Sequence, residues 1–180
     1  VESGVQNLTV IANDTGFETI GVGKLIVSGQ ATGAIASHVG TNKETGIRFN
    51  NGSLKLELSP QGTLAERIRS GGTGLGGVLT PTGIGTEVED GKDKIIVNGK
   101  EYLVELPLQA DVAILKGSIV DKSGNVYYEG TTKNFQIVMA LAAETVIVEA
   151  EKLVEVGEIN PNYVMTPGAL VDWIVLGGDK

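Results

Sequence analysis

The most informative segment for the fold class is residues 54–72, which read Leu-Lys-Leu-Glu-Leu-Ser-Pro-Gln-Gly-Thr-Leu-Ala-Glu-Arg-Ile-Arg-Ser-Gly-Gly. The apolar residues of Leu54–Leu58 predict a β-strand, and a polar loop follows it. Thr63 with Glu66 three residues later forms a capping box, which predicts the start of a helix. Gly71-Gly72 is typical of the residues that end a helix. A strand, a loop and a helix in this order indicate an α/β protein.

Further short apolar runs recur along the chain between glycine-rich breaks. Several are continuous rather than alternating, which is typical of strands covered on both faces and therefore of a largely parallel sheet. No internal repeat or linker interrupts the pattern, so we expect one domain over residues 1–180. The expected strands are Leu8–Ala12, Ala34–Val39, Leu54–Leu58, Val78–Thr80, Asp111–Leu115, Thr145–Val148 and Val171–Leu176.

One segment departs from this parallel pattern. Lys94–Val97 and Glu101–Glu105 flank Asn98-Gly99, the strongest short signal for an antiparallel hairpin. A second helix is expected over Phe135–Ala143, with Asn134 as its cap. The sequence therefore predicts an α/β fold, an open and mostly parallel sheet flanked by helices, with an inserted antiparallel β-hairpin.

The composition excludes several classes of function. The chain has no cysteine and a single histidine, His38, so we expect no disulfide, no thiolate site and no metal centre. A net charge of −8 with scattered basic residues gives no footprint for nucleic acid or an anionic membrane. No apolar run approaches the roughly 20 residues of a membrane span, and no signal peptide is visible. We therefore expect a cytoplasmic protein.

Gly72–Gly77 reads Gly-Thr-Gly-Leu-Gly-Gly and matches the dinucleotide-binding pattern G-x-G-x-x-G. That pattern must follow a strand and open a helix, whereas here it follows a helix and leads into a strand. A loop that lets backbone approach a neighbour closely is therefore favoured over a nicotinamide or flavin site. His38 ends an apolar run without an obvious triad, so we expect a structural or rim histidine rather than a general base.

Two polar segments follow predicted strands, which is where open α/β sheets bind ligands. Gln61 precedes a helix whose free N–H groups favour carboxylate or phosphate. Its amide can donate to a carboxylate or thioester oxygen, or Gln61 can be an ordinary loop residue. Asn13 and Asp14 follow the strand Leu8–Ala12. Asn13 can donate to an oxyanion, although a turn capped by Asp14 is the simpler interpretation.

The remaining candidates also have simple structural explanations. The Gly/Pro-rich loop after Val78–Thr80 can line a pocket but is equally good turn chemistry. Three basic residues can pair with an acidic substrate, although most such residues are solvated. From the residues alone, the sequence indicates an α/β domain with a candidate anion site. The pocket-lining candidates are Asp14, Gly62, Thr80 and Gly83, and the basic residues are Arg67, Arg69 and Lys133.

Several longer sequence segments, taken in order along the chain, resemble those of a known family. The most specific is the block Pro60–Thr63 that runs into the arginine-containing helix. The order and spacing resemble the α subunit of the family I CoA-transferases, the acetate/acetoacetate/butyrate and 3-oxoacid group, over essentially the whole chain. The matching phrases are Leu8–Asp14, Ile35–Asn42, Leu58–Gly72, Leu79–Gly83, Ala110–Ala113, Lys133–Phe135 and Thr166–Gly168.

The resemblance implies the CoA-transferase (NagB/RpiA-like) fold and a ping-pong transfer of CoA between carboxylic acids. A glutamate carboxylate attacks the acyl-CoA, a glutamyl-CoA thioester forms through an anhydride, and the incoming carboxylate reverses these steps. In the family this glutamate belongs to the β subunit, in a Ser/Glu-Asn-Gly motif. No glutamate precedes Asn-Gly here, so we expect no catalytic residue in this chain. The expected partners are a β subunit, as α2β2, an acyl-CoA and a short-chain carboxylate, with CoA as substrate and no cofactor.

By the same resemblance, Gln61 matches the substrate-contacting glutamine, and Asn13 lies in the asparagine loop on the oxyanion side. The family's α subunit begins with a strand and a Gly-Gly-Phe…Gly-x-Pro loop, which this sequence does not show, so we expect an N-terminal truncation. Two alternatives stay open. One is a non-catalytic sensor of a sugar phosphate or CoA with the same fold, and the other is an acyl-CoA hydrolase of the same family.

Overall fold

The computed structural model describes residues 1–177, and the chain divides into two compact units. The first holds Val1–Leu64 and Leu79–Val104, and the second holds Ala65–Val78 and the chain from Glu105 onward. The expectation of one domain stays a prediction. No helix among residues 1–177 has the length and apolar character needed to cross a membrane.

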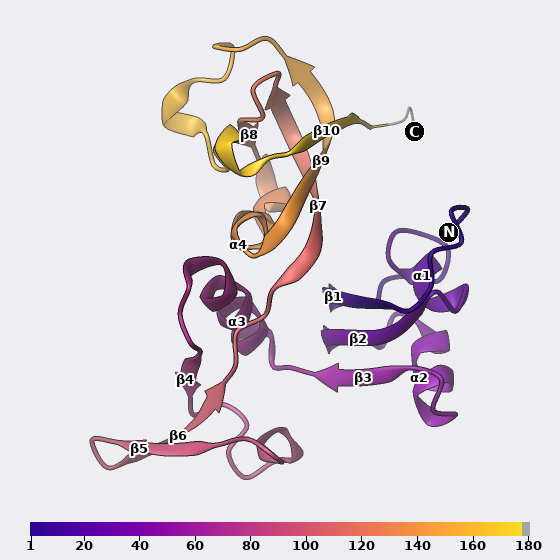
Figure 1. Ribbon diagram of the computed structural model, residues 1–180, viewed down its shortest axis with the longest axis vertical. Coiled ribbons are helices and arrows are strands. Elements are labelled where there is room, and N and C mark those ends of the chain that lie inside the picture. The colour runs from indigo at the N-terminus through magenta and orange to yellow at the C-terminus, as the bar shows by residue number, and fades with distance from the viewer. Residues whose placement is uncertain (178–180) are drawn as a thin grey trace. The chain divides into compact units, whose positions relative to one another are not determined.

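Three parallel strands form a sheet in the first unit, in the order β1-β2-β3 (Figure 1). They are β1 (Leu8–Asp14), β2 (Ala31–His38) and β3 (Lys55–Leu58). Helix α1 (Gly23–Val27) connects β1 to β2, and α2 (Lys43–Asn50) connects β2 to β3. Because each connection returns the chain to the same end of the sheet, the carboxyl ends of the three strands share one edge.

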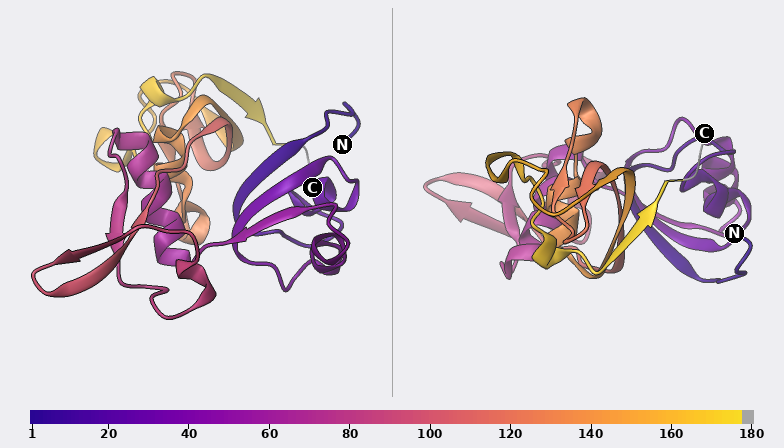
Figure 2. Two further views of the ribbon diagram at one scale, coloured as in Figure 1. Left: turned by 60° about the horizontal axis from the view of Figure 1, so that its bottom comes forward. Right: turned by 90° about the horizontal axis from the view of Figure 1, so that it is seen from above.

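Helices α1 and α2 lie on the same side of this sheet (Figure 2). Arg48 of α2 is buried and donates to the carbonyl oxygen of Ile26 in α1 at 2.6 Å, which joins the two helices. The core beneath them consists of Ile26, Ala31, Ala34 and Leu54, with Val10, Leu25 and Leu56 packed against it.

The predicted hairpin is confirmed. Strands β5 (Lys94–Val97) and β6 (Lys100–Glu105) pair antiparallel, and β4 (Val78–Thr80) lies on the other side of β6. Asn98 and Gly99 both have positive φ angles, +50° and +76°, as a two-residue type I′ turn requires.

The second unit is built on a four-stranded sheet in the order β10-β9-β7-β8. Strands β7, β9 and β10 are parallel, β8 pairs antiparallel with the end of β7, and helix α4 (Gln136–Leu141) precedes β9. The α/β class with mostly parallel strands and an inserted hairpin is thus confirmed. The strands are β7 (Ala110–Asp121), β8 (Val126–Tyr127), β9 (Ala143–Val154) and β10 (Trp173–Leu176), and 3-10 turns cover Glu87–Glu89, Gly130–Lys133, Pro161–Tyr163 and Gly168–Leu170.

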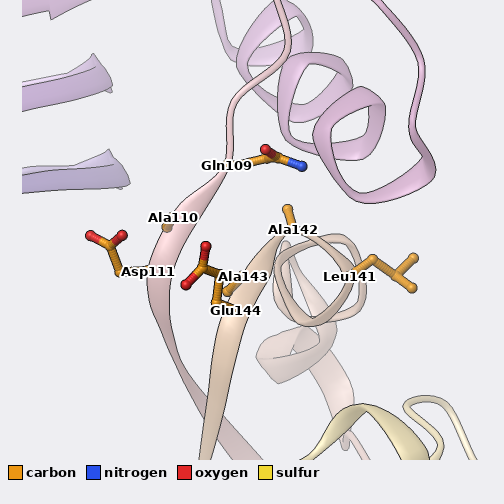
Figure 3. Close-up of a pocket in the computed structure, with 7 residues that line it drawn as sticks. All are labelled: Gln109, Ala110, Asp111, Leu141, Ala142, Ala143 and Glu144. Atoms are coloured by element: carbon orange, nitrogen blue, oxygen red, sulfur yellow. The ribbon is translucent and has the colours of Figure 1, made fainter.

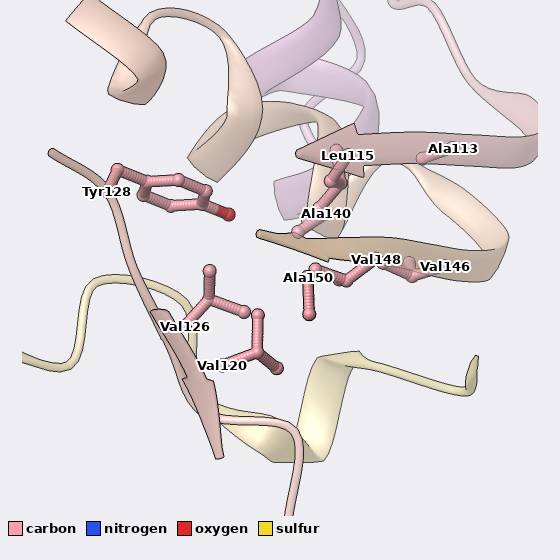
Figure 4. Packing of buried hydrophobic residues seen from close by; sticks show 9 residues of the cluster. All are labelled: Ala113, Leu115, Val120, Val126, Tyr128, Ala140, Val146, Val148 and Ala150. Carbon is pink, nitrogen blue, oxygen red and sulfur yellow. The ribbon is translucent and has the colours of Figure 1, made fainter. Parts of the chain in front are cut away.

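A cluster of small apolar side chains and one tyrosine forms the core of the second unit (Figure 4). The buried Tyr128 hydroxyl is satisfied by the Thr166 hydroxyl at 2.8 Å. Gly117 lies within β7, where an added Cβ would stand 2.5 Å from Val120 and 2.8 Å from Val126. The strand therefore needs glycine for packing, and the glycine does not end it. The cluster is Ala113, Leu115, Val120, Val126, Tyr128, Ala140, Val146, Val148 and Ala150.

The helix after β3 begins earlier than predicted. It is α3, which spans Gln61–Thr73. The N–H of Leu64 donates to the carbonyl oxygen of Pro60 at 2.8 Å, so the hydrogen-bond ladder begins before Thr63. The predicted capping box of Thr63 and Glu66 is therefore wrong. A proline beside the first turn suits a helix start, since its φ is already helical and it has no N–H to satisfy.

The same helix also continues through Gly71-Gly72, which was predicted to end it. An added Cβ at Gly71 would stand 2.0 Å from the carbonyl oxygen of Leu108, and one at Gly72 would stand 2.5 Å from the Cβ of Leu141. The two glycines thus permit a close approach of backbone and side chain within the second unit.

The second predicted helix is confirmed but shorter, as α4. Its N-cap residue is Phe135, with no side-chain cap, so the predicted Asn134 cap is wrong. The backbone of Asn134 has φ +18° and ψ −118°, outside the extended conformation that a capping asparagine adopts.

The turn between β7 and β8 is organised by the buried carboxylate of Asp121. It accepts hydrogen bonds from the N–H and hydroxyl of Ser123, at 2.9 and 2.7 Å, and from the N–H and side-chain amide of Asn125, at 3.0 and 2.9 Å. Burial by itself would raise the pKa of Asp121. The hydrogen bonds of Asn125 and Ser123 outweigh burial and hold that pKa below its ordinary value.

Replacing Asp121 with asparagine is expected to lower the free energy of unfolding by about 2–3 kcal/mol at neutral pH, because buried donors lose a charged acceptor. Since the folded pKa is depressed, this stabilisation is fully present above the unfolded pKa of about 4 and is lost as the pH falls through the folded pKa. Urea denaturation should show that wild type and Asp121→Asn differ less in their free energy of unfolding below about pH 4 than at neutral pH. A difference in the free energy of unfolding that does not change with pH would contradict a stabilising role of the ionised Asp121 carboxylate.

Candidate functional site

Three polar side chains meet at the carboxyl edge of the first unit's sheet. Asn13 is the last residue but one of β1, and Ser37 stands beside it near the end of β2, since the register pairs Ala12 with Ala36 and Asp14 with His38. Gln61 follows β3 as the first residue of α3. Sequence reasoning predicted Gln61 and Asn13 separately, and the structure brings them together.

Hydrogen bonds join the three side chains. The amide nitrogen of Gln61 donates to the side-chain oxygen of Asn13 at 3.2 Å. The hydroxyl of Ser37 faces the main-chain carbonyl oxygen of Asn13 at 2.8 Å and also contacts the amide oxygen of Gln61. Ser37 was not predicted as a site residue. Once the pairing of β1 with β2 is known, the alternation of side chains along a strand places Ser37 on the face that Asn13 occupies on the neighbouring strand.

The first turn of α3 adds backbone donors to this edge. The helical ladder opens with the Leu64 N–H, so the N–H groups of Gln61, Gly62 and Thr63 precede it. Such groups, with the positive end of the helix dipole, favour a carboxylate. An added Cβ at Gly62 would meet nothing within 4 Å, so this turn has open space above it.

Asp14 serves the loop after β1. Its carboxylate accepts from the Gly16 N–H at 2.9 Å and from the Thr41 hydroxyl at 2.5 Å, and so ties this loop to the loop before α2. This is the turn role given above as the simpler interpretation. A further role of Asp14 in lining a pocket stays a prediction.

Thr80 and Gly83 make contacts within their own loop. The Thr80 hydroxyl accepts from the Thr82 N–H at 3.1 Å. Gly83 has a φ of +99°, and an added Cβ would stand 2.6 Å from Val88, so glycine is needed there for both backbone and packing. Their role in lining a substrate pocket also stays a prediction.

The basic candidates have different surroundings. Arg67 is buried, donates to the carbonyl oxygen of Leu106 at 2.9 Å and lies 3.8 Å from the carboxylate of Glu105. Arg69 pairs with Glu66 on the surface of α3. Arg67 is therefore committed to the protein interior and is not presented to a substrate.

The glycine-rich stretch Gly72–Gly77 runs from the end of a helix to the start of a strand, which is the context that disfavours a dinucleotide site. Helix α3 ends at Thr73, and Val78 begins β4. An added Cβ at Gly77, whose φ is +146°, would stand 2.7 Å from the carbonyl oxygen of Glu105. The stretch permits a close backbone approach, as predicted.

A cavity of about 370 Å³ lies in the second unit, at the amino ends of β7 and β9 (Figure 3). The Gln109 amide donates to the carbonyl oxygen of Gly71 at 2.9 Å, while Asp111 and Glu144 contribute two carboxylates. Negative charge there disfavours an anionic ligand. The lining consists of Gln109, Ala110, Asp111, Leu141, Ala142, Ala143 and Glu144, none of them a predicted site residue.

The sequence matches the family model described as Coenzyme A transferase over residues 1–177. It is 58% identical over 175 residues to the acetoacetyl-CoA:acetate/butyrate CoA transferase alpha subunit of Clostridium acetobutylicum, covering 97% of this chain and 80% of the relative. It is 51% identical over 180 residues to the acetate CoA-transferase subunit alpha of Escherichia coli K12, covering 100% of this chain and 82% of the relative.

Solved structures agree on the fold. An acyl-CoA transferase apoenzyme from Escherichia coli O157:H7 superposes with a TM-score of 0.84 at 22% identity, over 97% of this chain and 38% of that chain. Glutaconate coenzyme A-transferase from Acidaminococcus fermentans gives 0.81 at 22% identity, over 97% and 63%. The family match over residues 1–177, together with two relatives above 50% identity, shows that the chain belongs to the coenzyme A transferase family.

Proposed function

We propose that this chain is the α subunit of a short-chain acyl-CoA:acetate/acetoacetate CoA-transferase. The observation that carries the proposal is the joined pair of amides, Asn13 and Gln61, at the carboxyl edge of a parallel sheet and beside the N-terminus of α3. The named activities of the relatives supply the substrate class, an acyl-CoA and a short-chain carboxylate.

The proposed reaction is a series of acyl transfers that needs no net proton transfer and no oxidation or reduction. A carboxylate oxygen of a glutamate on the partner β subunit attacks the thioester carbonyl carbon, and the C–S bond breaks to give an anhydride and CoA thiolate. The thiolate attacks the glutamyl carbonyl of that anhydride, which releases the first carboxylate and leaves a glutamyl-CoA thioester. The incoming carboxylate runs the same two steps in reverse. CoA is a substrate, and no cofactor is needed.

The part of this chain is to hold the oxygen on which negative charge develops. Each attack passes through a tetrahedral intermediate with a negatively charged oxygen. Side-chain N–H groups of Asn13 and Gln61 and backbone N–H groups of the first turn of α3 are suitable donors. Such donors stabilise the transition state more than the neutral thioester, which raises kcat.

Reconstitution tests the proposal. This chain, a β subunit from the same source and the two together are each given acetyl-CoA and either acetoacetate or butyrate, and the new acyl-CoA is measured. Transfer is expected only in the mixture, as a complex of two subunits of each kind. Release of free CoA without any acceptor acid would favour the hydrolase, and a mixture that neither transfers nor hydrolyses would favour a sensor.

Replacing His38 with alanine is expected to leave kcat of the assembled enzyme within about twofold of wild type, because His38 is exposed at the end of β2 and the proposed steps need no general base. Steady-state kinetics with both acceptors checks this. A large fall in kcat with an unchanged melting temperature would give His38 a role in the reaction.

A further inference from the structure

Ser37 lies between the two amide side chains that the proposed function uses. Its hydroxyl contacts the main-chain carbonyl oxygen of Asn13 at 2.8 Å and the side-chain oxygen of Gln61. Gln61 is exposed on the first turn of a helix, where a long amide side chain samples many rotamers. Ser37 is only half-buried, so burial in the core does not explain its hydroxyl.

Counting protons shows what this hydroxyl controls. A serine hydroxyl has one proton and faces two oxygens here, so it donates fully to only one of them at a time. When it donates to Gln61, the Gln61 nitrogen faces the Asn13 side-chain oxygen, as in the structure. When it donates to the Asn13 carbonyl, its lone pairs face Gln61. Both amides must then turn over for the nitrogen of Gln61 to donate to Ser37.

In both arrangements the three side chains stay connected, and each amide keeps at least one N–H outside the ring. An amide nitrogen carries two N–H groups, and the ring uses only one of those of Gln61. The remaining N–H is held in a fixed direction, as a donor to a developing oxyanion must be. Without the hydroxyl, the Gln61 side chain loses one of the two hydrogen bonds that residues 1–177 give it, and its amide is held by Asn13 alone among these hydrogen-bond partners.

We propose that Ser37 is a positioning residue of the transferase, whose hydroxyl holds the Gln61 amide so that its free N–H points at the reacting carboxylate or thioester oxygen. The inference rests on the proposed function and acts within the same site. It assigns Ser37 no direct contact with the substrate, so the effect of its removal must pass through Gln61.

The test is a double-mutant cycle in the assembled enzyme, with kcat and KM measured for acetyl-CoA and acetoacetate. Ser37→Ala is expected to lower kcat about tenfold, the value of one lost hydrogen bond, with little change in KM. Ser37→Thr keeps the hydroxyl and should retain most of kcat. In a Gln61→Ala background, the added Ser37→Ala change should have almost no effect, because the residue it positions is gone.

Ser28→Ala is the matched control. Ser28 also has a hydroxyl that bonds to a glutamine side chain, Gln30 at 2.9 Å, but at the opposite end of β2. It should leave kcat unchanged, and melting temperatures of all variants separate folding losses from catalytic ones.

Three results would overturn the positioning role of Ser37: wild-type kcat in Ser37→Ala, equal losses in Ser37→Ala and Ser37→Thr, or losses that multiply in the double variant. If Gln61→Ala still lowers kcat, any of these three results would leave the proposed function intact. An assembled wild-type enzyme that transfers no CoA would overturn both.

Discussion

Replacing Gln61 with alanine is expected to lower kcat of the assembled transferase by about a hundredfold or more, with a much smaller effect on folding. Gln61 is exposed, so its truncation leaves no cavity in the core. It removes the side-chain donor beside the N-terminus of α3 and leaves the Asn13 side chain without that hydrogen bond. An interaction that matters only when charge develops on the substrate oxygen lowers kcat and kcat/KM together.

Gln109→Ala is a matched control for this variant. Gln109 also uses its amide nitrogen in a hydrogen bond, to Gly71 at 2.9 Å, but it belongs to the second unit and lies outside the candidate site. Its kcat should equal that of wild type. Unchanged turnover in Gln61→Ala would remove Gln61 from the site, and a fall in melting temperature that matches the fall in activity would make its role structural.

Replacing Glu105 with alanine is expected to lower the free energy of unfolding by about 3–5 kcal/mol, because it breaks a buried ion pair. The side chains of Glu105 and Arg67 are only 2% and 8% exposed. Truncating the acid leaves a buried guanidinium with less compensation for its lost hydration. Urea denaturation should show a clear fall in the midpoint.

The exposed pair on the same helix provides the comparison. Arg69 and Glu66 are 3.1 Å apart, but their side chains are 52% and 50% exposed, so Glu66→Ala should cost only about 0.5 kcal/mol or less. The double variant Arg67→Met with Glu105→Leu should recover much of the loss, because two apolar residues need no compensating charge. Equal effects of Glu66→Ala and Glu105→Ala would contradict the importance of burial.

Much of the fold was predictable because its strands are short, continuous apolar runs between glycines. Glycine was misleading where it serves packing. Gly71-Gly72 was predicted to end a helix, although α3 continues through both. The strand predicted over Asp111–Leu115 likewise continues through Gly117 to Asp121. The partners that require Gly71 and Gly72, Leu108 and Leu141, are distant in sequence, so local pattern does not reveal them. Helices α1 and α2 were not predicted, since they are short and neither has a side-chain cap.

The meeting of Asn13 and Gln61 was predictable from topology. Asn13 and Gln61 each follow a predicted strand, and parallel strands bring those positions to one edge. Ser37 was missed because serine in a strand carries no signal without knowledge of its neighbours. Arg67 was considered for an acidic substrate, whereas its acidic neighbour is Glu105, 38 positions further along the chain. A pairing over that sequence separation depends on the tertiary fold.

The most direct test of the central claim is intact-mass spectrometry of both subunits after brief exposure to acetyl-CoA without an acceptor acid. We predict a CoA adduct on the β subunit alone, formed only when this chain is present and removed on addition of acetoacetate. A CoA adduct on this chain, or transfer by this chain without its partner, would contradict the division of roles proposed for the two subunits.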